Sequence, residues 1–116
     1  MAQQFDYRFN PPDEEHAPRR RVTMEELRTR RAELLAIGQR HGVSNIRVIG
    51  SVATGEADDE SDLDLLVDAA SGSSLWDLAD FALDVEELLG VFTQVVTVPA
   101  LKARIKNRVL AQAVPL

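Results

Sequence analysis

Hydrophobic positions divide the first half of the chain into one helical segment and two strand-like segments. Apolar residues repeat at helical spacing over residues 24–37. Thr23, with a glutamate three residues later, has the spacing of a capping box, and Gly42 supplies a stop, so a helix is expected between them. Residues 45–50 and 63–67 are short apolar runs typical of strands. The pattern predicts a helix followed by two strands.

The second half continues with a helix, a strand and a helix. Residues 75–89 have a long apolar stripe at helical spacing that Gly90 closes. Residues 91–98 are rich in β-branched side chains, which favour a strand. Pro99 is tolerated in a first helical turn, so a last helix is expected over about residues 100–112. This order predicts a small α/β domain whose mixed sheet has helices packed on one face.

The N-terminal segment lacks any such pattern. Residues 1–22 are polar and proline-rich, so they are expected to form a flexible N-terminal arm, and residues 23–116 to form one domain. An arm that becomes ordered on a partner is the alternative, with Phe5, Tyr7 and Phe9 as anchors at strand-like spacing.

Composition excludes several classes of function. The formal net charge of -6 argues against direct nucleic-acid binding by the chain as a whole. Because there is no cysteine, disulfides, thiolate metal sites and thiol nucleophiles are excluded. No apolar run has membrane-spanning length and no N-terminal apolar segment suggests a signal peptide, so a cytoplasmic location without membrane association is expected.

The most informative residues lie around the second predicted strand. Asp62 and Asp64 are one residue apart, so they point to the same side while the leucines at 63 and 65 point to the core. Two neighbouring carboxylates are costly unless a cation is present, and Mg²⁺ binds through one or two carboxylates plus substrate phosphates. The same acids could instead be strand-edge charges that prevent aggregation. The glycine turn at Gly50 and Ser51 would allow backbone N–H groups to approach a phosphate.

These residues carry a family resemblance. Gly50 and Ser51, ten intervening residues, and then Asp62-Leu63-Asp64 resemble the signature of the DNA polymerase β-like nucleotidyltransferase superfamily. In so short a chain the motif is similar to that of the minimal nucleotidyltransferase antitoxins, and the resemblance covers residues 23–116. It implies a three- or four-stranded mixed sheet with the metal carboxylates on its open side.

The resemblance also implies an activity. Asp62 and Asp64 would be the catalytic metal ligands for up to two Mg²⁺ ions, and Gly50 and Ser51 would bind the triphosphate of ATP. The expected function is that of an antitoxin that neutralises a HEPN-family ribonuclease toxin by transferring AMP to a toxin hydroxyl, that of a tyrosine. Transfer to a small molecule is disfavoured because this chain has no room for an additional substrate domain.

Two positions depart from the family pattern. Where members have a third carboxylate on the third strand, this chain has Gln94, which carries no charge and accepts no proton at neutral pH. Thr54 stands where members often have a basic residue. An alternative therefore remains open, in which a catalytically impaired antitoxin neutralises its toxin by direct binding.

Overall fold

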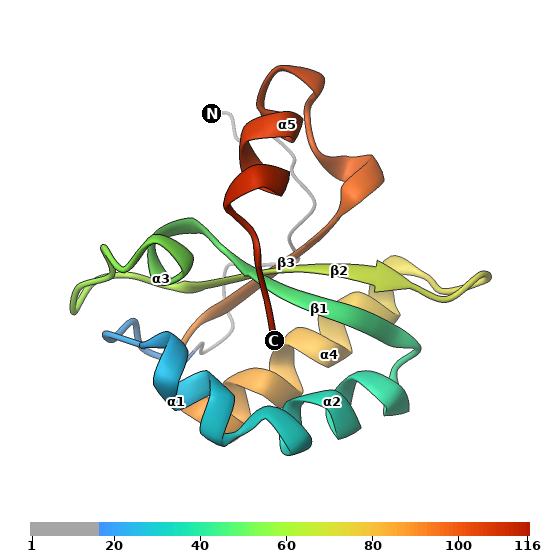
Figure 1. The fold of residues 1–116 in the computed structure, drawn as a ribbon. Helices are drawn as coiled ribbons and strands as arrows, with labels where there is room; N and C mark the ends of the chain where they lie inside the picture. The colour runs from blue at the N-terminus through green and yellow to red at the C-terminus, as the bar shows by residue number, and fades with distance from the viewer. Residues whose placement is uncertain (1–16) are drawn as a thin grey trace, which may run out of the picture.

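The computed structural model describes residues 17–116, which form a four-stranded mixed sheet with helices (Figure 1). The strands are β1 (Val43–Ile49), β2 (Leu63–Ala69), β3 (Thr93–Thr97) and β4 (Val114–Pro115). The helices are α1 (Met24–Thr29), α2 (Arg31–Arg40), α3 (Gly50–Thr54), α4 (Leu75–Leu89), the short 3-10 helix η1 (Val98–Ala100) and α5 (Ala103–Gln112). The predicted fold class, a small mixed sheet with packed helices, is confirmed.

The strands lie in the order β3-β2-β1-β4. β1 pairs antiparallel with β2 and with β4, whereas β2 pairs parallel with β3. A parallel pair needs a crossover, and α4 provides it between β2 and β3. The register of the parallel pair places Gln94 directly opposite Asp64. The strand β2 thus has the acidic pair at its start, beside the start of its parallel neighbour β3.

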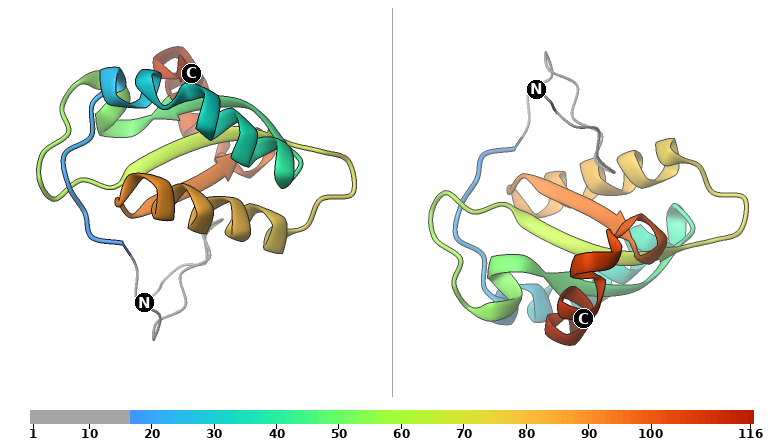
Figure 2. Two further views of the ribbon diagram at one scale, coloured as in Figure 1. Left: turned by 90° about the horizontal axis from the view of Figure 1, so that it is seen from below. Right: turned by 90° about the horizontal axis from the view of Figure 1, so that it is seen from above.

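The helices cover the two faces of the sheet unequally. α1, α2 and α4 pack under one face, and α5 stands over the other (Figures 1 and 2). The apolar stripe of α4 is buried against the sheet, with Phe81 and Val85 fully inaccessible to solvent. In contrast, α5 contains no buried residue. The core therefore lies on the α1, α2 and α4 side, and the opposite face is left for α5 and a cavity.

The described part of the predicted N-terminal arm packs on the domain. The Pro18 carbonyl accepts a hydrogen bond from the Phe92 backbone N–H at 2.9 Å. Arg20 donates to the Leu89 carbonyl at 2.8 Å and pairs with Glu26. Residues 1–16, including Phe5, Tyr7 and Phe9, lie outside the described residues, so the boundary at residue 22 stays a prediction.

Several elements differ in extent from the expected ones. The first predicted helix is two helices, because Arg30 leaves helical geometry at φ -106° and ψ 16°. The last helix begins at Ala103 instead of residue 100, after η1. The glycine turn continues into α3, and the C-terminal residues form β4 against β1. None of these changes moves the acidic pair from the start of the central strand.

Within residues 17–116, none of the helices combines the length and the apolar character that crossing a bilayer requires.

A polar clasp, formed by Arg40, His41 and Asp84, joins the end of α2 to α4 on the face of the sheet that the helices cover. The Asp84 carboxylate accepts a hydrogen bond from His41 Nε2 at 2.6 Å, and Arg40 lies 3.4 Å away. The hydrogen bond from His41, and then that from Arg40, hold the pKa of the Asp84 carboxyl below its ordinary value. The ionised form of Asp84 is therefore the form that the folded chain favours.

This clasp predicts a pH dependence of stability. Because the pKa of Asp84 is lower in the folded than in the unfolded chain, its stabilisation is present above about pH 4 and is lost as pH falls through the folded-state value. We expect Asp84→Asn to lower the free energy of unfolding at neutral pH and to lose less stability than wild type below about pH 4. Urea unfolding across this range measures both effects, with Asp80→Asn on the exposed side of α4 as control. Parallel pH profiles for wild type and Asp84→Asn would contradict the prediction.

Candidate active site

A cavity of about 390 Å³ lies between the open face of the sheet and α5. Asp62 and Asp64 both line it, as their alternation predicts. Leu63 and Leu65 point the other way and are 0% and 1% exposed. Since β2 is flanked by β1 and β3, the acids do not lie on a sheet edge, and a role in blocking edge aggregation does not apply. The predicted acidic pair faces one solvent-accessible space.

Gly50 brings the backbone directly against the acidic pair. Its φ of +75° is in the left-handed region, where glycine is favoured. A Cβ at this position would stand 2.7 Å from Asp64 Oδ2. Ser51 is half-buried in the first turn of α3 and is not part of the cavity lining. The first N–H groups of a helix have no partner within it, so α3 presents donors beside a carboxylate.

Gln94 lies where the family resemblance implies a third carboxylate, and its side chain donates a hydrogen bond to Asp62. It is 5% exposed, and its Nε2 donates to Asp62 Oδ2 at 2.5 Å. A neutral amide therefore holds one acid in place from the neighbouring strand. A carboxylate at residue 94 would instead place a second negative charge at this distance.

Two arginines at the site were missed in the sequence. Arg19 Nε lies 4.0 Å from Asp62 Oδ2, and its guanidinium lies over the Phe92 ring at 4.6 Å from the centroid. Arg108 of α5 lines the cavity opposite the acids. Arg19 falls in the predicted arm. Arg108 is one of four basic residues near the C-terminus, whose charge allows contact with a phosphate or a partner but does not single out this residue.

The donor set fits a cation that arrives with a phosphate ligand. Among residues 17–116 no group of three histidine, cysteine or acidic residues could hold a metal ion by itself. Mg²⁺ does not need one, because it is commonly bound by one or two carboxylates together with substrate phosphates and water. Asp62 and Asp64 on one cavity wall supply that number of carboxylates. Their roles as metal ligands remain a prediction.

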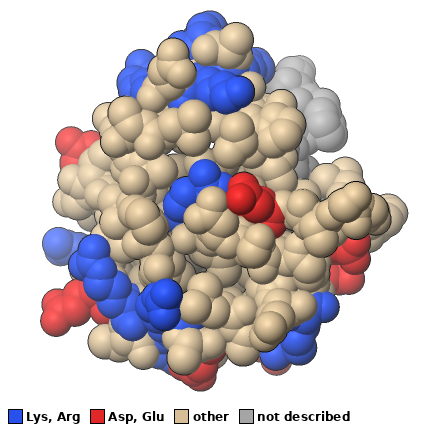
Figure 3. Space-filling view, turned by 45° about the vertical axis from the view of Figure 1, so that its right-hand side comes forward, with Lys and Arg blue, Asp and Glu red and all other residues tan. Residues whose placement is uncertain are grey.

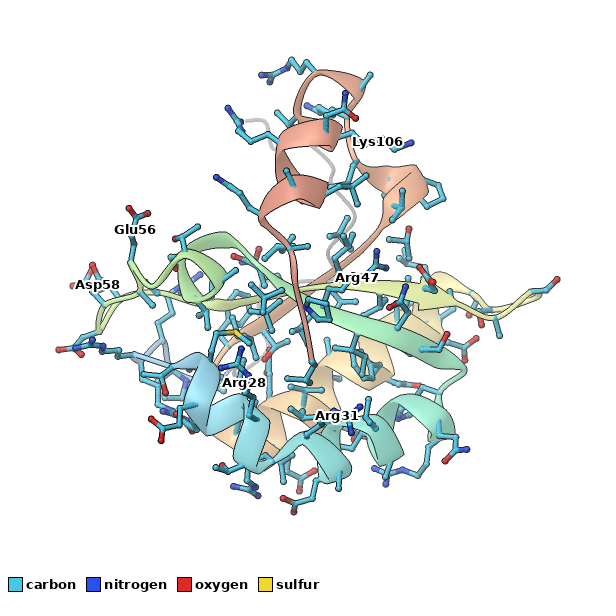
Figure 4. All side chains as sticks on the ribbon, in the orientation of Figure 1. Arg28, Arg31, Arg47, Glu56, Asp58 and Lys106 are labelled. Atoms are coloured by element: carbon cyan, nitrogen blue, oxygen red, sulfur yellow. The ribbon has the colours of Figure 1, made fainter. Side chains whose placement is uncertain are left out.

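The other polar residues of the motif region lie away from the cavity. Thr54 donates to the Ser51 carbonyl at 3.3 Å and contacts Glu56, and it lines a separate hollow. The acidic loop is held by its own bonds, with Asp58 accepting from the Glu60 backbone at 2.9 Å. In Figure 4 the Glu56 and Asp58 side chains point outward from this loop. The loop acids are not part of the cavity lining.

Gly50→Ala tests the close approach of backbone and carboxylate. We expect it to lower the free energy of unfolding by about 1–3 kcal/mol, because it adds left-handed strain and a contact with Asp64. Gly55→Ala is a matched control, since Gly55 has φ +81° but no atom of residues 17–116 lies within 4 Å of the added Cβ. Urea unfolding of both variants measures the difference. If Gly50→Ala is no less stable than Gly55→Ala, the contact with Asp64 does not contribute to the loss of stability.

Gln94→Glu tests whether the acids share a cation. Without divalent metal, we expect a lower Tm, because a hydrogen bond to Asp62 is replaced by repulsion between carboxylates. Adding Mg²⁺ should raise the Tm of this variant more than that of wild type. Gln112→Glu adds the same charge on the α5 side of the cavity and serves as the control. An equal response of all three chains to Mg²⁺ would refute a shared cation at Asp62.

The amino-acid sequence of this chain matches a known protein family. The family model described as a nucleotidyltransferase domain matches residues 11–115. A protein adenylyltransferase, MntA, of Thermococcus cleftensis is 35% identical over 94 residues, which cover 80% of this chain and 95% of that protein. A candidate protein adenylyltransferase of Methanocaldococcus jannaschii is 35% identical over 82 residues, covering 71% of this chain and 88% of that protein.

Solved structures agree with these sequence matches. A structure described as a candidate minimal nucleotidyltransferase has a TM-score of 0.73 and 45% identity, covering 82% of this chain and 97% of that one. The crystal structure of a toxin-antitoxin with AMP-PNP has a TM-score of 0.62 and 17% identity, covering 72% of this chain and 69% of that one. The second likeness shows the shared fold alone.

Proposed function

This chain belongs to the nucleotidyltransferase domain family, and on that basis we propose that it is an antitoxin that transfers AMP from ATP to a hydroxyl group of a toxin protein. The family match confirms the resemblance seen in the motif. The toxin is of the HEPN ribonuclease family and the acceptor is a tyrosine hydroxyl. The observation that carries the proposal is the convergence of Asp62, Asp64 and Gly50 on one cavity.

The similar proteins support the choice of reaction and partner. Both curated relatives are named for adenylyl transfer to proteins, and each aligns with this chain over most of its own length. The more distant structural neighbour is a toxin-antitoxin crystallised with AMP-PNP, a nucleotide analogue.

The proposed reaction breaks one bond and forms one. The acceptor oxygen attacks the α-phosphorus of ATP, the bond from that phosphorus to the bridging oxygen breaks, and pyrophosphate leaves with the electron pair. The hydroxyl proton passes to water. Asp62 and Asp64 would hold Mg²⁺, and the backbone at Gly50 and Ser51 would bind the triphosphate. When bound, Mg²⁺ neutralises charge on the entering and leaving oxygens.

Gln94 is expected to slow the proposed reaction. It holds Asp62 by a hydrogen bond but cannot accept the hydroxyl proton or add charge to a metal site. Loss of a general base typically costs about 10²- to 10⁴-fold in rate. We therefore expect slow turnover, sufficient for a stable modification of a tightly bound partner.

The same observation favours a second candidate. A chain whose Asp62 is held by Gln94 and approached by Arg19 could neutralise the toxin by covering its surface, with the nucleotide site vestigial or used for sensing. The two candidates differ in whether protection of cells requires Asp62 and Asp64.

A labelling experiment tests the reaction. The purified chain is incubated with its HEPN toxin partner, Mg²⁺ and ATP labelled on the α-phosphate, and we expect label on the toxin. ATP labelled on the γ-phosphate should give none, because pyrophosphate leaves. Asp64→Ala should abolish labelling, since it removes a proposed metal ligand, whereas Asp59→Ala in the exposed loop should not.

Growth of cells that express the toxin separates the two candidates. If the Asp62→Ala, Asp64→Ala double variant no longer protects cells, enzymatic neutralisation is supported. If no label reaches the toxin and the double variant still protects, the binding candidate replaces it. Absence of both labelling and protection by wild type would contradict both candidates.

A further inference from the structure

The charges around the cavity are unevenly arranged. Asp62 and Asp64 form one wall, and Arg108 lines the opposite wall, together with Val109 and Gln112 of α5. Of the described residues that line the cavity, Arg108 is the single basic one. Residue 54, in the turn after the glycine, is a threonine that faces a different hollow. A polyanion bound beside the carboxylates would therefore find a basic side chain of the cavity lining on α5, that of Arg108.

Arg108 is available for such a ligand. Among residues 17–116, no hydrogen bond or ion pair engages its side chain. Arg19 is different, because it lies beside Asp62 and over the Phe92 ring. An arginine that faces two carboxylates across a cavity and has no partner of its own is suited to binding an anion that enters between them.

The packing of α5 allows Arg108 to adjust. The helix rests on α3, the element that begins at Gly50, and none of its residues is buried. It stands apart from the core, and Figure 3 shows basic side chains gathered over it at the top of the molecule. The basic residues of this helix and the residue before it are Lys102, Arg104, Lys106 and Arg108. Small shifts of α5 toward a ligand would therefore cost little core packing.

From these observations we propose that Arg108 binds the β- and γ-phosphates of the nucleotide and so selects a triphosphate over a monophosphate. This inference rests on the proposed nucleotidyl transfer and adds a residue to it. The carboxylates on one wall of the cavity would hold Mg²⁺ beside the phosphate chain. Arg108 adds a positive charge for the terminal phosphates on the α5 side of the cavity, and its guanidinium can bind two of their oxygens at once. The same contact neutralises charge on pyrophosphate as it leaves.

Nucleotide binding by the full chain tests this role. In calorimetric titrations with Mg²⁺ present, we expect Arg108→Ala to raise the Kd for ATP by about 10- to 100-fold, the range for a lost hydrogen-bonded charge. The Kd for AMP should be unchanged, because AMP lacks the terminal phosphates. Arg108→Lys should fall between wild type and Arg108→Ala, since it keeps the charge and loses the fork.

Arg104→Ala is the matched control, because it removes the same charge one turn earlier on α5 without touching the cavity lining. It should leave the Kd for ATP near that of wild type, and the Tm of both variants without nucleotide should equal that of wild type. Equal losses for Arg104→Ala and Arg108→Ala, or equal weakening of ATP and AMP by Arg108→Ala, would overturn the role of Arg108. A wild-type chain that binds no ATP would contradict the proposed function itself, and with it this role.

Discussion

The Asp64 carboxylate lies so close to the backbone at Gly50 that any side chain there would meet it at 2.7 Å. This approach ties the end of β1 and the start of α3 to the start of β2, and thereby sets the cavity wall. Because Gly50 has a left-handed φ, the chain can turn into α3 without moving away from the acid. Backbone donors and a carboxylate thus lie side by side, an arrangement suited to a phosphate that carries its own cation.

The environment of Asp62 differs from that of Asp64. Gln94 donates to Asp62 from the parallel strand, and Arg19 reaches it from the segment before α1. Both contacts are to the same carboxylate oxygen, Asp62 Oδ2. They would compete with a metal ion for this oxygen, which would weaken metal binding relative to a site with three carboxylates. The structure therefore joins a cavity lined by two carboxylates to a third position that carries no charge, which fits the slow adenylyl transfer that we propose.

The positions of strands and helices were largely predictable, because the residues that a strand or helix buries recur at a regular spacing in the sequence. The alternation around Asp62 and Asp64 gave their common side, and the stripe of α4 gave its buried face. α3 was missed because five residues are too few for a periodic signal, and β4 because its pairing with β1 depends on where α5 ends. Arg19 and Arg108 reach the site from distant segments. Only the tertiary arrangement brings them there, so no local pattern could identify them.

The central claim is that Asp62 and Asp64 hold a divalent cation together with a nucleotide beside Gly50. The most direct measurement is a crystal structure of the chain grown with Mn²⁺ and AMP-PNP, with anomalous scattering used to locate the manganese. We expect a manganese peak between the two carboxylates, with the phosphates of the analogue against the turn at Gly50. A nucleotide bound elsewhere, or manganese with no contact to either acid, would contradict the claim.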